Sequence, residues 1–158
     1  MTRLPSLGPR GEGWVVIQVL LFGLILLAGS VGPAWDGVAR VAATVAGVVL
    51  LGAGALLVVR GIVDLRGGLT PFPHPRAGAE LVETGAYRLA RHPIYGGGVL
   101  GAAGFGLMTA SPLALGGALV LLGFFGLKSG REEAWLEAHY PGYGAYRART
   151  RRLIPFIW

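Results

Sequence analysis

LVETGAYRLARHPIY, the stretch from Leu81 to Tyr95, separates two long apolar halves of the chain. It is dense in polar and aromatic side chains, and its Arg91-His92-Pro93 step lies just where hydrophobicity resumes. A second polar cluster, KSGREE, spans Lys128 to Glu133 and follows the last apolar run. We expect these two clusters to carry any chemistry, and we predict that folding brings them together at one face of a membrane.

The composition is typical of an integral membrane protein. Of the 158 residues, 53% are hydrophobic and only 14% are charged, which lies outside the usual range for a soluble domain. The chain has no cysteine, so disulfides and a cysteine nucleophile are excluded. Three scattered histidines, His74, His92 and His139, do not predict a metal site. The net charge is +6, and the basic residues flank the apolar segments. We therefore expect them to interact with anionic lipids and not with nucleic acid.

Four apolar runs, 14–31, 38–59, 93–110 and 112–128, predict four transmembrane helices. About 20 residues cross a hydrocarbon core of about 30 Å. The first run is longer than the apolar part of a usual signal peptide. The last two runs are marginally long enough to span, and Ser111-Pro112 between them is a turn and helix-start signal. We therefore predict an all-α integral membrane fold in one domain, with the last two helices forming a short hairpin.

Glycines are abundant in the third apolar run. Gly97 and Gly101 have GxxxG spacing, which predicts close contact between helices. The stretch from Gly101 to Gly106 is rich in glycine like a dinucleotide-binding loop, but it lies within an apolar span that no strand precedes. We therefore predict no Rossmann domain.

Segments 60–92 and 129–158 are predicted to be cytosolic and to bind a cofactor. The first contains charges and a proline-rich run at 71–75, which favours extended chain. The second has helical character that Pro141-Gly142 must interrupt, and its apolar end, 153–158, is expected to lie at the membrane interface. All 14 Lys and Arg residues except Arg40 fall on one side of a four-span topology. This asymmetry places both termini and both clusters in the cytoplasm, and we expect an inner or plasma membrane.

Taken singly, the polar residues also have structural explanations. Arg91 can extend to lipid phosphate, and His92-Pro93 can simply begin a helix. Tyr87 and Tyr95 are usual anchors at a membrane interface. The case for a functional site therefore rests on the combination of motifs.

The order of motifs in the carboxy-terminal half is specific. It reads Leu-Val-x-x-Gly-x-Tyr-Arg-x-x-Arg-His-Pro-x-Tyr, an apolar hairpin, Glu-Glu-x-x-Leu, Tyr-Pro-x-Tyr-x-x-Tyr and Arg-x-Ile-Pro. From Pro71 to Pro155 the chain resembles the isoprenylcysteine carboxyl methyltransferase family and related phospholipid methyltransferases. The resemblance implies an S-adenosylmethionine-dependent enzyme that methylates a lipophilic small molecule or a lipid.

The resemblance also assigns residues to the site. By match to the family motif, the cofactor pocket would be lined by Leu81, Val82, Tyr87, His92, Pro93, Ile94, Tyr95 and Glu132. Family members carry a substrate-binding arginine four residues before the glutamate. Lys128 holds that position here, and it keeps the charge without the bidentate fork of a guanidinium.

Physical chemistry supports these roles. The protein must bind and orient the cofactor and exclude water. The aromatic faces of Tyr87 and Tyr95 favour a sulfonium cation. Glu132 can accept hydrogen bonds from the cofactor's ribose or amine, and Arg91 can meet its carboxylate.

A base is needed only for some acceptors. A carboxylate acceptor needs none, whereas an amine must first lose a proton. His92 and Glu133 are the two candidates for that base. The residues leave the acceptor open, since a lipophilic acid, thiol, amine or phenol would fit, and they leave the oligomeric state open as well.

Two other functions fit parts of the pattern. Membrane sterol reductases share an Arg-His-Pro step and a late acidic residue, and they bind a nicotinamide cofactor such as NADPH. They have many more spans, which argues against a complete reductase in 158 residues. A non-enzymatic membrane assembly module would need the small residues but not His92 or Glu132.

Overall fold

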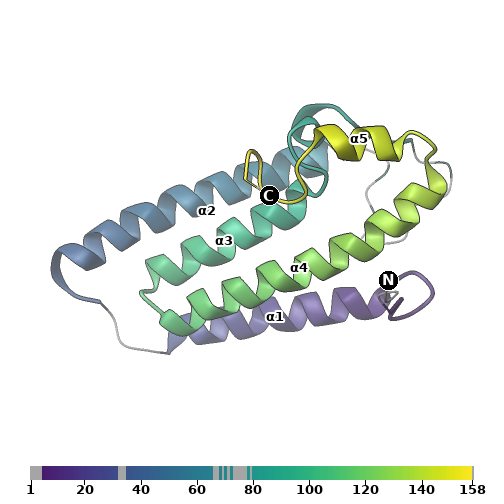
Figure 1. Cartoon of the computed structure of the whole chain (residues 1–158). Coiled ribbons are helices and arrows are strands. Elements are labelled where there is room, and N and C mark those ends of the chain that lie inside the picture. The colour runs from purple at the N-terminus through teal and green to yellow at the C-terminus, as the bar shows by residue number, and fades with distance from the viewer. Residues whose placement is uncertain are drawn as a thin grey trace.

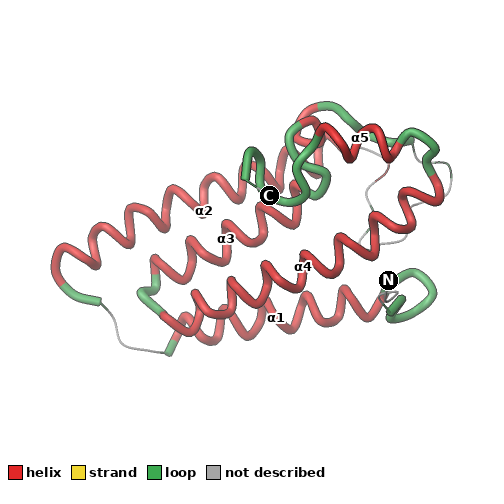
Figure 2. The backbone as a smooth tube through the Cα atoms, viewed as in Figure 1, coloured by secondary structure: helices red, strands yellow, loops and turns green. Residues whose placement is uncertain are grey.

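The computed structural model describes residues 5–31, 35–65, 68, 70, 72, 78 and 80–157. Every regular element in these residues is helical: α1 (Glu12–Ser30), α2 (Gly37–Leu65), the short 3-10 helix η2 (Gly85–Arg88), α3 (Pro93–Met108), α4 (Pro112–His139) and α5 (Tyr143–Arg149) (Figure 2). The four long helices lie side by side in an elongated bundle, in which α3 packs between α2 and α4, and α1 packs on α4 (Figure 1). The predicted all-α fold is confirmed.

Three of the described helices, α1, α2 and α4, are long and apolar enough to cross a bilayer, while α3 is apolar and shorter, at 16 residues. Large apolar side chains on α1 and α2 face outward; Val19 and Leu56, for example, are 63% and 64% exposed. A soluble protein rarely exposes so continuous an apolar surface. The chain is therefore an integral membrane protein.

Two helices extend beyond the apolar runs that predicted them. α2 continues to Leu65, and α4 continues through the second polar cluster to His139. Hydropathy marks where a helix leaves hydrocarbon, but charged residues do not end a helix, whereas proline does. Accordingly, α4 ends just before Pro141, as predicted, and α5 begins after it. Of the predicted proline-rich run, residues 71 and 73–75 lie outside the described residues.

The turn between α3 and α4 follows the predicted helix-start signal. The Ser111 hydroxyl accepts a hydrogen bond from the Ala114 N–H at 3.2 Å, and Pro112 occupies the first helical position. The Ser111 hydroxyl also donates to the Ala28 carbonyl of α1 at 2.7 Å. One residue therefore starts α4 and attaches it to α1.

α2 and α3 meet backbone to backbone. A Cβ on Gly54 would lie 2.6 Å from the Gly97 carbonyl oxygen, and a Cβ on Gly97 would lie 2.6 Å from the Gly54 oxygen. Gly47 and Gly104 face each other in the same reciprocal way, at 2.7 and 2.6 Å. Side chains at these four positions would force the helices apart, so glycine sets their separation.

The predicted contact through Gly97 is confirmed, but its equivalent along α3 is Gly104 rather than Gly101. A Cβ on Gly101 would make only an ordinary contact, 3.8 Å from Leu51. The glycines that require close approach are thus spaced by seven residues. Seven residues are about two helical turns, so this spacing keeps the contact on one side of each helix.

The end of the chain folds back on the bundle. Leu153 is fully buried, and its carbonyl occupies the space that a side chain at Gly96 would fill. Leu153 therefore packs inside the protein, and the membrane-interface location of 153–158 stays a prediction. Phe156 and Ile157 remain 81% and 77% exposed, and Trp158 lies outside the described residues.

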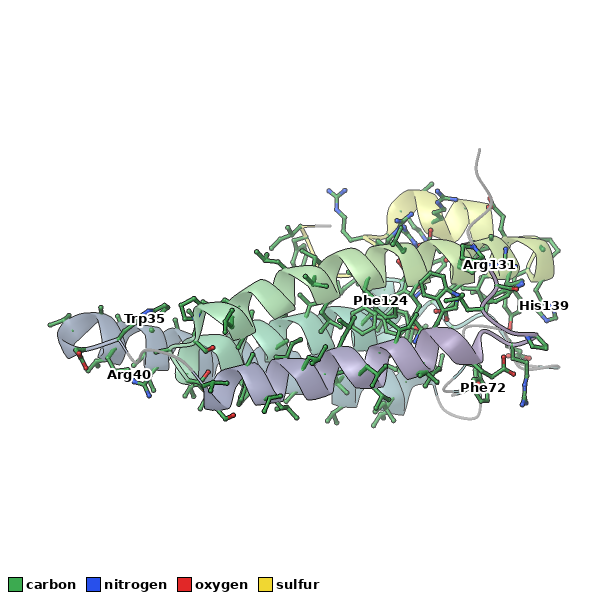
Figure 3. All side chains as sticks on the ribbon, turned by 90° about the horizontal axis from the view of Figure 1, so that it is seen from below. Trp35, Arg40, Phe72, Phe124, Arg131 and His139 are labelled. Carbon is green, nitrogen blue, oxygen red and sulfur yellow. The ribbon has the colours of Figure 1, made fainter. Side chains whose placement is uncertain are left out.

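The two ends of the bundle differ in polarity. Arg40 and Trp35 lie at one end, whereas Arg131 and His139 lie at the other (Figure 3). The second end also contains η2, α5 and the start of α1. Both polar clusters of the sequence therefore share one end of the molecule.

Candidate active site

The first polar cluster is attached to α2 through Asp64. The Asp64 carboxylate accepts a hydrogen bond from the Ala86 N–H at 2.7 Å. The preceding Gly85 has a φ of +59°, and a side chain there would collide with the same carboxylate. Position 85 therefore requires glycine, both for its positive φ and for its lack of a side chain. The sequence did not assign a role to Asp64; its only signal is an acidic residue at the end of an apolar helix.

The carboxy-terminal segment fixes the backbone around His92. The Arg91 N–H donates to the Arg151 carbonyl at 2.8 Å, and the His92 N–H donates to the Arg152 carbonyl at 2.9 Å. Pro93 then begins α3. Backbone contacts with Arg151 and Arg152, near the end of the chain, therefore fix the position of His92.

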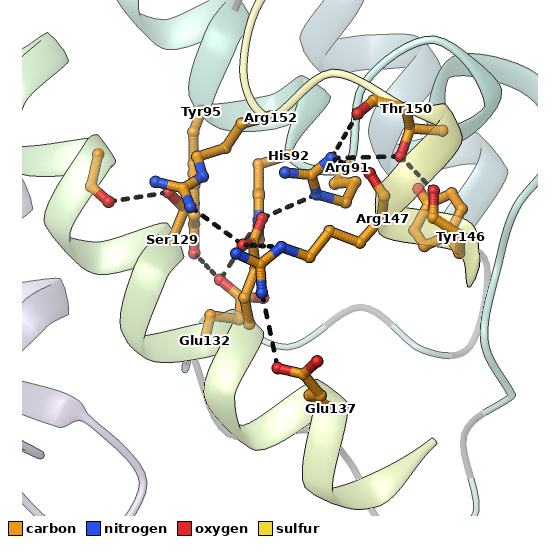
Figure 4. A network of polar contacts seen from close by, with 12 residues as sticks. Arg91, His92, Tyr95, Ser129, Glu132, Glu137, Tyr146, Arg147, Thr150 and Arg152 are labelled. Atoms are coloured by element: carbon orange, nitrogen blue, oxygen red, sulfur yellow. Dashed lines mark hydrogen bonds and ion pairs between the residues drawn. The ribbon is translucent and has the colours of Figure 1, made fainter. Parts of the chain in front are cut away.

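His92, Tyr95 and Glu132 form a compact group. The Tyr95 hydroxyl donates to Glu132 Oε2 at 2.8 Å, and His92 Nδ1 lies 3.7 Å from the same oxygen (Figure 4). The His92 and Tyr95 rings are parallel, with centroids 5.4 Å apart, and Tyr95 is also parallel to Phe125 at 4.6 Å. The Glu132 side chain is 21% exposed, whereas that of the neighbouring Glu133 is 3% exposed.

Glu133 is instead enclosed by cations. Its carboxylate lies 2.8 Å from Arg91 Nε, 3.2 Å from Arg152 Nη2 and 3.7 Å from Arg147 Nε. His92 Nε2 lies 3.4 Å from it, without the geometry of a hydrogen bond. The Glu133 side chain is 3% exposed. One buried carboxylate thus links the first polar cluster, α5 and the chain end.

Arg91 is engaged within the protein. Besides Glu133, its guanidinium reaches the end of α5, where Nη1 donates to the Arg147 carbonyl at 3.1 Å and to the Thr150 carbonyl at 2.5 Å. A cation at this position satisfies carbonyls that the helix leaves unpaired. Arg91 therefore binds α5 to the rest of the site.

Lys128 lies one helical turn before Glu132 and is 1% exposed. Its ammonium donates to Gln18 Oε1 of α1 at 2.5 Å and lies 4.8 Å from the centre of the Tyr95 ring. Gln18 was not predicted as a site residue. Its signal in the sequence is that it is the only strongly polar side chain between residues 14 and 29, where a polar group is costly unless it has a partner.

Buried tyrosines surround this group. Burial, together with the charge of Glu132, raises the pKa of Tyr87 well above its usual range. The Tyr146 hydroxyl donates to the Tyr87 carbonyl at 2.7 Å. Burial likewise raises the pKa of Tyr143 and Tyr146, so all three remain neutral phenols.

Two buried polar atoms near the site have no hydrogen-bond partner among the described residues. They are His92 Nε2 and the Tyr143 hydroxyl, and Tyr143 is 1% exposed. Buried groups are nearly always paired, so such exceptions are notable. The Tyr143 hydroxyl is therefore suited to contact a bound molecule, whereas His92 Nε2 already lies 3.4 Å from Glu133 Oε1.

The structure brings together six of the expected site residues: Arg91, His92, Tyr95, Lys128, Glu132 and Glu133. Pro93 and Ile94 lie against α2, where a Cβ on Gly61 would meet both. Leu81 and Val82 are partly buried just before η2. Among the described residues, no cluster of His, Asp and Glu side chains is placed to hold a metal ion.

Comparison with known families identifies one match. The family described as phospholipid methyltransferase matches residues 42–142. This range includes both polar clusters. It excludes α1 and residues 143–158, which carry Arg147 and Arg152. No curated protein matches the chain.

Proposed function

The chain belongs to the phospholipid methyltransferase family, and from this premise we propose that it transfers the methyl group of S-adenosylmethionine to the amine of a phospholipid headgroup. Family membership makes it a membrane methyltransferase for lipid-like substrates. The cofactor and the amine acceptor are our proposals. The observation that carries them is the contact of His92 and Tyr95 with Glu132, which joins both polar clusters at one end of an apolar bundle.

The residues present fit the proposed cofactor. Its sulfonium group supplies an electrophilic methyl group. Glu132 offers a partly exposed carboxylate for hydroxyl or ammonium donors, and Tyr95 holds that carboxylate in place. The unpartnered Tyr143 hydroxyl offers a further hydrogen bond. Tyr87, Pro93, Ile94, Leu81 and Val82 would complete the cofactor site.

The role of Arg91 follows from its contacts. Its guanidinium is bound to Glu133 and to the carbonyls that end α5, so we propose that it positions the site rather than binding the cofactor's carboxylate. Arg152 has a side chain that is 27% exposed and lies in the same charge cluster. We propose Arg152 for the carboxylate contact.

His92 is the better candidate for the base. An ammonium acceptor must lose a proton before its nitrogen can attack a methyl group. Three arginines stabilise the charged form of Glu133, which makes it a poor proton acceptor. His92 lies between two carboxylates, with Nδ1 3.7 Å from Glu132 and Nε2 3.4 Å from Glu133, and their charges favour the protonated imidazole. We propose that His92 accepts the proton, and that the buried Lys128 ammonium lies on the acceptor side of the site.

We further propose that the site faces the cytoplasm. Among the described residues, the end of the bundle that contains both polar clusters holds Arg91, Arg131, Arg147 and Arg152, and Arg40 lies at the opposite end (Figure 3). Positive residues favour the cytoplasmic side. A water-soluble cofactor would then enter from the cytosol, while a lipid acceptor reaches the site from the bilayer.

The experiment is a direct transfer assay. Protein purified in detergent is incubated with methyl-labelled S-adenosylmethionine and phosphatidylethanolamine, and the products are identified by mass spectrometry. We expect labelled N-methylated lipid, and we expect loss of label with His92→Ala and Glu132→Ala. Binding of NADPH without binding of S-adenosylmethionine would overturn the proposal in favour of a reductase.

A further inference from the structure

Asp64 lies where a helix disfavours an acidic residue. It is the second-last residue of α2, and the carboxyl end of a helix carries a partial negative charge that favours cations over carboxylates. The family match covers this position, but neither polar cluster of the sequence includes it. A side chain that departs from the local rule is expected to have a partner outside its own helix.

That partner is η2, which packs against α2. Thr84 precedes η2, yet its side chain forms no capping hydrogen bond in the described structure, so the first N–H groups of η2 have no local acceptor. Asp64 replaces this cap: its Oδ2 accepts from the Ala86 N–H, the second of η2, at 2.7 Å. Gly85 allows the approach, because a Cβ there would collide with the carboxylate. Asp64 therefore caps η2 from another helix.

Ala86 connects this cap to the Arg91-His92 step. Its carbonyl accepts from the Leu89 and Ala90 N–H groups, each at 3.1 Å. Both Ala86 and Ala90 are buried. The turn that leads into Arg91-His92 thus begins at the residue whose N–H is bound by Asp64, and the place of this step relative to α2 depends on that contact.

The end of α2 also contacts the start of α3. A Cβ on Gly61 would lie 2.8 Å from Ile94 Cγ1 and 3.2 Å from Pro93 Cγ. Gly61 and Asp64 are three residues apart and therefore share a face of α2. This face meets the first polar cluster on both sides of His92.

Tyr87 is held on two sides. The Ala86 N–H before it is bound by Asp64, and the Tyr87 carbonyl accepts from the Tyr146 hydroxyl of α5 at 2.7 Å. Tyr87 is itself buried. Loss of the Asp64 contact would release one of these two sides and would move Tyr87 and His92 relative to α2.

We infer that Asp64 is a positioning residue for the cofactor site: through the Ala86 N–H it fixes the place of Tyr87 and His92 relative to α2. The inference rests on the proposed function, in which Tyr87 lines the cofactor site and His92 accepts the proton. It adds a residue that acts through the backbone of η2. Such a residue contributes placement, and a shift of about 1 Å can cost about 100-fold in rate.

Substitutions at position 64 test whether the oxygen acceptor matters. Asparagine keeps an oxygen that can accept from the Ala86 N–H, whereas leucine has a similar size and no acceptor. Isothermal titration in detergent measures the Kd for S-adenosylmethionine. Asp64→Leu should raise this Kd about tenfold or more, while Asp64→Asn should stay within about threefold of the unsubstituted protein. Equal affinity in all three proteins, or equal loss in both variants, overturns the inference.

If Asp64→Leu does not fold, Asp64→Glu takes its place. Glutamate keeps the acceptor but is one methylene longer, so it displaces η2 from α2. Its Kd should be about tenfold or more above that of Asp64→Asn, and equal affinity of these two variants overturns the inference.

Gly104→Ala is the control for a general loss of stability. Its Cβ would lie 2.6 Å from the Gly47 carbonyl oxygen, at a contact between α2 and α3 that does not involve η2. This variant should lower the thermal unfolding temperature and leave the Kd for S-adenosylmethionine within about threefold. If it weakens binding as much as Asp64→Leu does, Asp64 acts through stability alone and the inference is wrong.

A transfer assay with methyl-labelled S-adenosylmethionine and phosphatidylethanolamine separates this inference from the proposed function. Asp64→Leu should raise KM for the cofactor and lower kcat, because Tyr87 and His92 both move. KM for the lipid should change by less than about threefold, since Lys128 on α4 is not part of this link. If the unsubstituted protein neither binds the cofactor nor transfers the label, the proposed function fails and the inference fails with it. If it does both and the variants at position 64 match it, only the inference fails.

Discussion

Tyr95 and Glu132 are 37 residues apart in the chain, and the hydroxyl of one donates to the carboxylate of the other at 2.8 Å. The contact joins the first turn of α3 to the charged part of α4. A second contact joins the same two polar clusters: Arg91 Nε lies 2.8 Å from Glu133 Oε1. The two adjacent glutamates have different surroundings, since Glu132 is partly exposed and Glu133 is enclosed by arginines. This difference underlies the first two predictions.

Glu132→Gln should weaken binding of S-adenosylmethionine about tenfold or more, because charge-assisted hydrogen bonds are roughly twice as strong as neutral ones. Isothermal titration in detergent measures the affinity. Glu137→Gln is the matched control, since Glu137 lies on the same helix with a side chain that is 55% exposed. Equal affinities for both variants would remove Glu132 from the cofactor site.

Arg91→Ala and Glu133→Ala should each lower the free energy of unfolding by about 3–5 kcal/mol, because each leaves a buried charge without its partner. The double variant should lose less than the sum, since both substitutions break the same pair. Denaturant titration in detergent gives the three values. If Arg91→Ala reduced cofactor binding without any loss of stability, the positioning role would be wrong.

Gly97→Ala should destabilise the protein by about 1–3 kcal/mol, because its Cβ would lie 2.6 Å from the Gly54 carbonyl oxygen. Gly101→Ala is the control in the same helix, where the added Cβ would make only a 3.8 Å contact. It should be neutral or stabilising by up to about 1 kcal/mol. Thermal unfolding of the two variants tests which glycine sets the helix separation. A larger loss of stability in Gly101→Ala than in Gly97→Ala would contradict the role of Gly97.

Tyr143→Phe should have opposite effects on stability and binding. The buried hydroxyl has no hydrogen-bond partner in the described structure, so its removal should stabilise the free protein by about 1–3 kcal/mol. The same change should reduce the affinity for S-adenosylmethionine if the hydroxyl donates to the cofactor. On one preparation, thermal unfolding measures the stability, and titration with S-adenosylmethionine measures the affinity. A stabilised variant with full affinity would exclude Tyr143 from the site.

The orientation in the membrane can be tested by labelling single cysteines, because the chain contains none. Val38 and Ala138 are both exposed; Val38 lies in the first turn of α2 near Arg40, and Ala138 lies next to His139 in the last turn of α4, at the opposite end of the bundle (Figure 3). A membrane-impermeant maleimide added to intact cells should label Val38→Cys and not Ala138→Cys. After the cells are lysed, both should react. Labelling of Ala138→Cys alone in intact cells would reverse the proposed topology.

Much of the fold could be predicted because the signals are local. Uninterrupted apolar runs indicate spanning helices, and Ser111-Pro112 and Pro141 mark where helices begin and end. The motif order placed chemistry in the two polar clusters, and these clusters do meet. The apolar runs did not show that α2 continues to Leu65, or that α4 is one helix from Pro112 to His139, because hydropathy locates the edge of the membrane rather than the end of a helix.

Individual partners could not be predicted, because they depend on the rotation and separation of helices distant in sequence. Gln18 lies 110 residues from Lys128, and nothing in either local pattern specifies that they meet. Leu153 is buried only because Gly96 leaves room for the returning chain.

The sequence by itself determined that this protein is a helical membrane methyltransferase and where its polar residues gather, since hydropathy and motif order are properties of consecutive residues. Only the tertiary structure decided what each polar residue does. Glycine contacts at Gly54 and Gly97 bring α2 and α3 together, and the return of the chain end supplies Arg152 to Glu133. Three arginines then enclose Glu133, while Glu132 remains partly exposed, because the two neighbouring side chains point from α4 in different directions.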